Sequence, residues 1–111
     1  MQHTLLQNMR LSYGLVYDTA QRASSLIGWG DGKSFTIKDL VDDINRFDNY
    51  TVNEQQVHRA LSALVEMNCL ILANGTTLDD AKVAPVDQTV PCFEQFATWR
   101  KAKRHEELMR G

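Results

Sequence analysis

A run of amide and hydroxyl side chains with a single arginine lies between residues 53 and 62. Its members are Asn53, Gln55, Gln56, Arg59 and Ser62. Asparagine and glutamine amides can pair bidentately with adenine, arginine can pair with guanine, and a serine hydroxyl can bond a base or a phosphate. Spaced along one face of a helix, this set indicates contacts with base edges in a DNA groove. The alternative is a solvated polar face, on which several Lys and Glu residues would be more usual.

Groups close to this run could hold the phosphate backbone. Asn53 can also cap a helix, and the first backbone N–H groups of that helix favour a phosphate. Lys33 and Lys38 precede the run and add positive charge, so we expect both to contact DNA. The overall charge opposes this expectation, because the chain carries a formal net charge of -2 and phosphate binding draws on Lys and Arg.

Charge is unevenly distributed in the C-terminal part of the chain. Residues 91–111 carry five Lys and Arg residues against three Glu residues, whereas residues 75–90 carry one Lys against three Asp residues. Cations gathered around the polar run would favour DNA, and acids gathered there would repel it and favour a protein partner. The sequence alone leaves this alternative open.

Two short amphipathic helices are predicted to position these side chains. Thr36 can cap the first helix, and Asp39 supplies the acid three residues after the cap. Residues 47–51 then interrupt the pattern with Asp and Asn, which predicts a tight polar turn. Each helix has an apolar stripe with a 3.6-residue period, which predicts its buried face. The stripes are Ile37, Leu40, Val41 and Ile44 in the first helix and Val57, Leu61, Leu64 and Val65 in the second.

A β-hairpin is predicted to follow the second helix. Residues 69–73 form an unbroken apolar run that ends at Asn74 and Gly75, which predicts a strand and then a turn. Residues 82–86 predict the return strand, with Pro85 at an edge. The glycine-rich residues 28–33 predict a turn that leads into a short strand at residues 34–35, which joins the hairpin.

Longer helices are predicted on both sides of this unit, at about residues 4–27 and 91–110. The N-terminal helix repeats apolar residues at three-four spacing, so it either packs on the two short helices or contacts a second chain. Aromatic residues in the first half of the C-terminal helix predict docking. Its charged second half is interpreted as a solvated face or an oligomer contact, rather than a tail that contacts phosphates.

Composition narrows the class of protein. The 111 residues are expected to form one domain with its core at residues 34–86, and 43% hydrophobic with 23% charged residues is typical of a globular protein. No apolar run approaches the length of a membrane span and no secretory pattern is present, so we expect a cytoplasmic protein without membrane contact. Cys69 and Cys92 are interpreted as small apolar residues, with a disulfide between them as the alternative.

Catalytic, metal and cofactor sites are not expected. The histidines His3, His58 and His105 lie in three separate predicted elements, and no Cys-x-x-Cys or His-x-x-x-His pair is present to bind a metal. The segment at residues 28–34 is one residue short of a phosphate-binding loop and follows a predicted helix. The acid pairs at residues 42–43 and 79–80 have no second cluster that would complete an active site.

Residues 34–86 resemble the winged helix-turn-helix domains of small bacterial and phage transcription regulators. FTIKDLVDDI is similar to their second helix, and VHRALSALVEMNCLIL to their third helix and the strand that follows, with Asn68 where glycine is commoner. The long flanking helices resemble the dimerisation arms of PadR-like regulators. The resemblance implies a homodimeric, sequence-specific regulator that binds double-stranded DNA. Each protomer would place residues 53–62 in a major groove, with half-sites about one helical turn apart.

Two features depart from that family and support a second hypothesis. The hairpin carries acids where DNA-binding wings usually carry Arg or Lys, and the reading helix has a single Arg. A winged-helix module that binds protein instead of DNA would keep the fold and lose the charge. Its contacts would come from the loop around Trp29, the acidic hairpin or the helix at residues 93–99.

Overall fold

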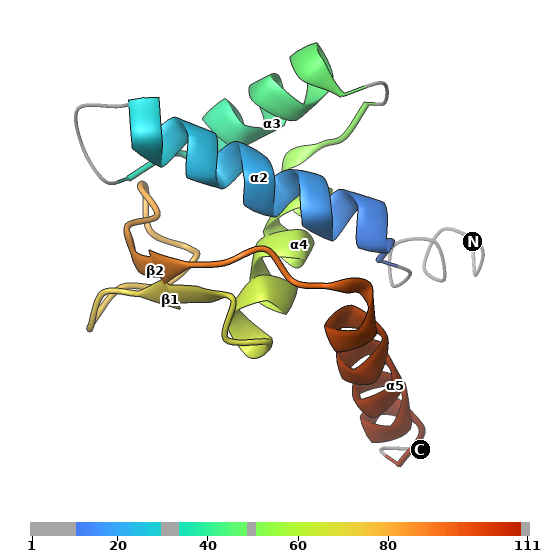
Figure 1. Ribbon diagram of the computed structural model, residues 1–111. Coiled ribbons are helices and arrows are strands. Elements are labelled where there is room, and N and C mark those ends of the chain that lie inside the picture. Colours follow the sequence, from blue (N-terminus) through green and yellow to red (C-terminus); the bar gives the residue numbers. More distant parts are fainter. Residues whose placement is uncertain (1–10, 30–33, 49–50, 110–111) are drawn as a thin grey trace.

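The computed structural model describes residues 11–29, 34–48 and 51–109, and there it is mainly helical with one small antiparallel sheet (Figure 1). The expected mainly α fold with a small β-hairpin is therefore confirmed. The elements are α2 (Tyr13–Trp29), α3 (Ile37–Phe47), α4 (Glu54–Glu66), β1 (Leu70–Leu72), β2 (Pro85–Gln88) and α5 (Phe93–Met109). Within these ranges no helix has both the length and the apolar character needed to cross a membrane.

α2 starts and ends at residues other than those predicted. Residues 4–10 of the prediction lie outside the described residues, and Leu11 and Ser12 precede the helix rather than belonging to it. Ser12 acts as a cap, because its Oγ accepts a hydrogen bond from the backbone N–H of Leu15 at 3.1 Å. At the other end the helix continues through Gly28 to Trp29, so the predicted break begins later than residue 28.

α3 begins where the sequence predicts. Thr36 has an extended backbone, and its Oγ1 accepts a hydrogen bond from the backbone N–H of Asp39 at 3.0 Å. This bond satisfies one of the N–H groups that a helix start leaves without a partner. The predicted apolar face is buried through Leu40, Val41 and Ile44.

The core lies where α2 crosses α3 and α4 (Figure 1). Alanines on the facing sides of α2 and α4 are fully buried, and small side chains of this kind let two helices approach closely. Larger apolar residues fill the remaining space and extend the core to the sheet. They are Val16, Leu40, Ile44, Val57, Leu61, Leu64, Leu70 and Val83.

The hairpin is confirmed, but its return strand is shifted. β1 pairs antiparallel with β2, with Leu70 opposite Gln88 and Leu72 opposite Pro85. β2 therefore starts at Pro85 and not at residue 82 as predicted. The reason is that the hairpin loop, residues 73–84, folds on itself through turns and uses residues that the prediction assigned to the strand.

The chain before α3 joins the hairpin through one bridge. Phe35 and Val83 exchange backbone hydrogen bonds, with Phe35 N–H donating to the Val83 carbonyl at 3.0 Å and Val83 N–H donating back at 2.8 Å. Both side chains are buried. The predicted meeting of residues 34–35 with the hairpin is thus confirmed as a single bridge between distant parts of the chain.

α4 ends in a left-handed residue, Asn68, whose φ is 60°. Its N–H bonds the Val65 carbonyl at 3.0 Å, and the N–H of Cys69 bonds the Leu64 carbonyl at 2.8 Å. Asparagine is one of the few residues other than glycine that adopt this conformation readily. This explains why Asn68 can stand where a glycine is commoner.

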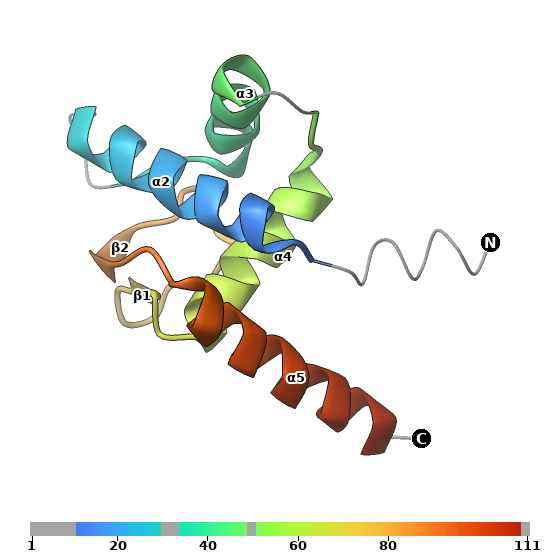
Figure 2. The same cartoon turned by 45° about the vertical axis from the view of Figure 1, so that its right-hand side comes forward.

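α5 projects away from the rest of the molecule, as the two views show (Figures 1 and 2). Its first half docks through buried Phe96, whose ring centroid lies 5.7 Å from that of Tyr13, so the predicted aromatic docking is confirmed. Gln95 Nε2 donates to the Met67 carbonyl at 3.1 Å, and Lys103 Nζ pairs with Glu66 at 3.1 Å. The helix spans Phe93–Met109, and its second half is largely exposed, as predicted.

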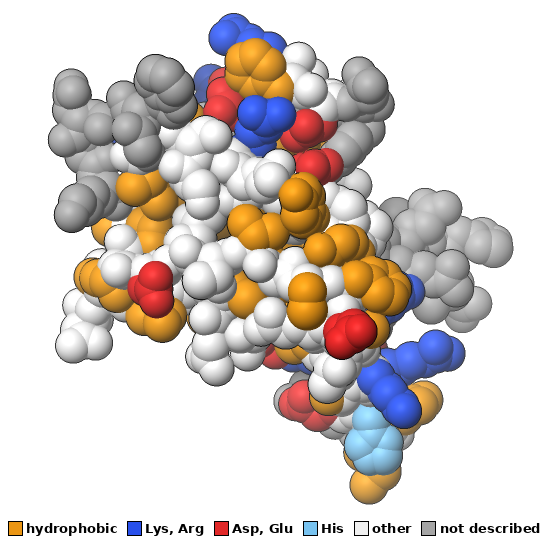
Figure 3. Space-filling model, in the orientation of Figure 1, with side chains coloured by type: hydrophobic (Ala, Val, Ile, Leu, Met, Phe, Trp, Pro, Cys, Tyr) orange, Lys and Arg blue, Asp and Glu red, His pale blue; other side chains and the backbone are white. Residues whose placement is uncertain are grey.

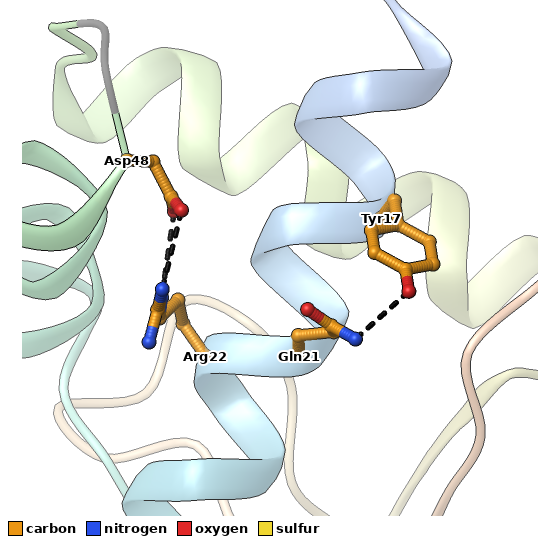
Figure 4. Close-up of polar contacts among 4 residues, drawn as sticks. All are labelled: Tyr17, Gln21, Arg22 and Asp48. Atoms are coloured by element: carbon orange, nitrogen blue, oxygen red, sulfur yellow. Dashed lines mark hydrogen bonds and ion pairs between the residues drawn. The ribbon is translucent and has the colours of Figure 1, made fainter.

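An ion pair fixes α2 to the end of α3 (Figure 4). Arg22 Nη2 and Nε donate to the two carboxylate oxygens of Asp48 at 3.2 and 3.4 Å, and the Arg22 guanidinium lies 5.0 Å from the centre of the Phe47 ring. The hydrogen bond to Asp48 raises the pKa of Arg22 above its ordinary value. Nearby on α2, Gln21 donates to the Tyr17 hydroxyl at 2.9 Å.

Candidate nucleic-acid interface

α4 turns its predicted apolar stripe inward. Val57, Leu61 and Leu64 are fully buried, while Val65 is only partly buried against the core. On the opposite side Gln55 and Gln56 are exposed, and Arg59 and Ser62 are half-buried. The polar run therefore forms a surface, and its first turn is the part most open to a ligand.

Two residues of the polar run are used by the helix itself. Asn53 Oδ1 accepts from the N–H of Gln56 and Gln56 Oε1 accepts from the N–H of Asn53, both at 2.9 Å, which forms a capping box. Bidentate pairing with adenine needs both the oxygen and the nitrogen of an amide side chain. The capping box holds the Gln56 side chain against the helix start, so Gln55 and Arg59 are the side chains best placed to contact bases.

An open hollow lies beside this first turn, between the start of α3, the start of α4 and the hairpin loop. Lys38 lies on its α3 side and is exposed, as a contact to phosphate would require. Acidic groups outnumber this cation. The full lining is Thr36, Ile37, Lys38, Glu54, Gln55, His58, Leu78, Asp79, Asp80 and Ala81.

The hairpin loop holds its acids in a defined position. The N–H of Thr77 donates to Asp80 Oδ2 at 2.7 Å, and the N–H of Asp79 donates to Thr77 Oγ1 at 3.2 Å. Leu78 packs against the core. Asp79 Oδ1 then lies 3.2 Å from His58 Nε2, although the carboxylate itself is 89% exposed. The loop thus places a negative charge directly on the outer side of α4.

The C-terminal cations lie elsewhere. Arg100, Lys101, Lys103 and Arg104 lie on α5, which leaves the body near the end of α4, and Lys103 there is paired with Glu66. Arg110 lies outside the described residues. On the face that Figure 3 shows, Lys and Arg side chains lie near α3 and over α5, with uncharged side chains and a few separate acids between them. The basic residues of α5 therefore do not converge with Lys38 and Gln55 at the start of α4.

Some predicted features lie outside the described residues, and one cysteine is placed differently from the prediction. Lys33 and the loop at residues 30–33 lie outside the described residues. Cys69 is buried as expected, but Cys92 is exposed just before α5, where its Sγ accepts from the N–H of Gln95 at 3.4 Å. Both cysteines are free, so the alternative disulfide is not formed.

The described residues bring together no group of three His, Cys, Asp or Glu side chains that could hold a metal ion. His58 faces the hairpin loop and His105 is exposed on α5. The contact between His58 and Asp79 was not predicted, because it joins residues far apart in sequence. The acid pair in the hairpin was the only sequence signal near it.

Comparison of the chain with protein-family models, with curated proteins and with solved structures finds no match.

Proposed function

We propose that residues 34–86 form a winged helix-turn-helix and that the protein is a sequence-specific transcription regulator that binds double-stranded DNA. The observation that carries the proposal is the arrangement of α3 and α4, close in sequence and packed together, followed by a hairpin that pairs with residue 35. In such domains the second helix of the pair enters the major groove. Here that helix is α4, which leaves its first turn exposed beside the hairpin loop.

The contacts in this proposal come from three elements. Gln55 and Arg59 on α4 would contact base edges, with Ser62 further along the helix. Lys38 at the start of α3 would bind a phosphate, and so would the capped start of α4 at Asn53. Gln56 would support the helix start rather than read a base.

The regulator is proposed to act as a homodimer in the cytoplasm. α5 supports this proposal because it extends from the body and leaves Leu108 and Met109 72% and 75% exposed. A second protomer could cover these side chains. Two reading helices related by a two-fold axis would then meet half-sites about one helical turn apart.

A pull-down of sheared genomic DNA across a salt series tests the proposal. The wild-type protein should enrich a palindromic site, and Gln55→Ala combined with Arg59→Ala should lose it, at a cost of about 1 to 3 kcal/mol per base contact. The matched control is Gln21→Ala combined with Arg104→Ala. It removes the same side-chain types from exposed positions on α2 and α5.

A second candidate function is a winged-helix module that binds a protein. The observation in its favour is the negative charge of the hollow, which is lined by Glu54, Asp79 and Asp80 but by only one lysine. Such a surface repels phosphates and suits a basic partner. Failure of the wild-type protein to retain any DNA, even at low salt, would exclude the regulator and support this module.

A further inference from the structure

We propose that Asp79 competes with DNA, because its carboxylate occupies His58 beside the start of α4 and so weakens DNA binding. The inference rests on the proposed function and concerns the same surface. It assigns to the hairpin loop an inhibitory contact in place of the phosphate contacts that the loop of a DNA-binding winged helix commonly makes.

The position of the carboxylate is set by the loop and not by chance contact. Leu78 anchors the loop in the core, and the bonds between Thr77 and the next two acidic residues fold the turn. Asp79 contributes its backbone N–H to that turn, which leaves its carboxylate to reach His58 at 3.2 Å. The side chain of Asp80, by contrast, is used within the turn.

The contact between Asp79 and His58 lies where a DNA phosphate would have to bind. Lys38, Gln55, His58 and Asp79 line one hollow at the start of α4. When a reading helix enters the major groove, the phosphate backbone passes close to the start of that helix. A phosphate bound by Lys38 or His58 would therefore lie beside the Asp79 carboxylate, and two like charges at that range repel.

DNA binding then becomes an exchange of one anion for another. Either Asp79 leaves His58 and a phosphate takes its place, or the phosphate binds against an uncompensated negative charge. Both routes lower affinity relative to a loop without the carboxylate. At a separation of about 4 Å in water, one repulsive unit charge corresponds to about a fivefold change in affinity.

Asp79→Asn tests this inference, because it removes the charge and keeps both the backbone N–H and a side-chain oxygen that can accept from His58. The measurement is the affinity for the DNA site recovered in the pull-down, by fluorescence anisotropy at low and high salt. We expect about fivefold tighter binding at low salt, with the gain shrinking as salt screens the charge. The matched control is Asp87→Asn, which removes an exposed acid from β2 outside the hollow.

A second pair of variants tests the role of His58. If the carboxylate acts by occupying this histidine, Asp79→Asn should gain much less affinity in a His58→Gln background, because the two residues act as a unit. An equal gain from Asp79→Asn and Asp87→Asn would overturn the inference while the regulator stands. An undiminished gain in the His58→Gln background would overturn the occupation of His58 and leave repulsion by the Asp79 charge as the cause. A wild-type protein and variants that all fail to bind DNA would overturn both.

Discussion

At the scale of single residues, the start of α4 depends on a mutual bond between Asn53 and Gln56. Asn53→Ala should lower the free energy of unfolding by about 1 kcal/mol, because the N–H of Gln56 loses its acceptor. The measurement is urea unfolding followed by circular dichroism. Gln55→Ala is the control, since this neighbouring side chain is exposed, and it should leave stability within about 0.5 kcal/mol of the wild type. Equal losses in both variants would show that the capping box is not formed in solution.

Asn68 carries a different kind of constraint, in the backbone. Its φ of 60° is strained for most side chains, and a β-branched residue is least able to adopt it. Asn68→Val should therefore destabilise the protein by about 1 to 2 kcal/mol, whereas Asn68→Gly should be tolerated or stabilising. Thermal unfolding of the two variants measures the difference. A valine variant as stable as the glycine variant would mean that α4 ends in another conformation.

At the scale of elements, the orientation of α4 can be tested by comparing a substitution on its buried face with one on its outer face. Leu61 is fully buried and Ser62, next to it, is half-buried on the other side. Leu61→Ala should lower the free energy of unfolding by about 2 to 5 kcal/mol, because it removes apolar contacts and leaves a cavity. Ser62→Ala should have little effect on stability. Denaturant unfolding of the two variants measures the difference in stability. A Leu61→Ala variant as stable as the wild type would show that Leu61 does not face the core.

The elements that the sequence predicts well are those with a local cause. Thr36 and Asn53 mark helix starts because a cap and its partner lie three residues apart, and the apolar periods of α3 and α4 fix their buried faces. The start of α2 at residue 13 was missed because the cap at Ser12 interrupts a continuing apolar period. The start of β2 was missed because turns inside the hairpin loop are decided by side chains such as those of Thr77 and Asp80.

The other features that the sequence did not predict are contacts between residues far apart in the chain. Arg22 meets Asp48, and Gln88 on β2 donates to the Ala20 carbonyl and to Ser24 on α2. No pattern in one chain marks such pairs, because each depends on how whole helices pack. The same holds at the candidate interface, where His58 meets an acid that is 21 residues away in the chain.

At the scale of the whole molecule, the proposed homodimer depends on α5. Its attachment uses residues 93–99 and the pair between Lys103 and Glu66, while the last turns have little contact with the body. Truncation after residue 99 should therefore preserve the fold and, if the proposed dimer forms through α5, convert it to a monomer. Sedimentation velocity measures the mass, with circular dichroism to check the fold. A dimer that survives truncation would assign self-association to another surface.

The bridge between Phe35 and Val83 has a consequence for the order in which the chain folds. The two short helices and the hairpin are each built from neighbours in sequence, and such contacts form quickly. The bridge instead closes a loop that contains α3, α4, β1 and most of the hairpin loop, and closing a long loop costs entropy before any bond is gained. The helix pair can thus be assembled before the hairpin is fastened to it, so the hairpin loop that carries Asp79 takes its place beside α4 only after the two helices have formed.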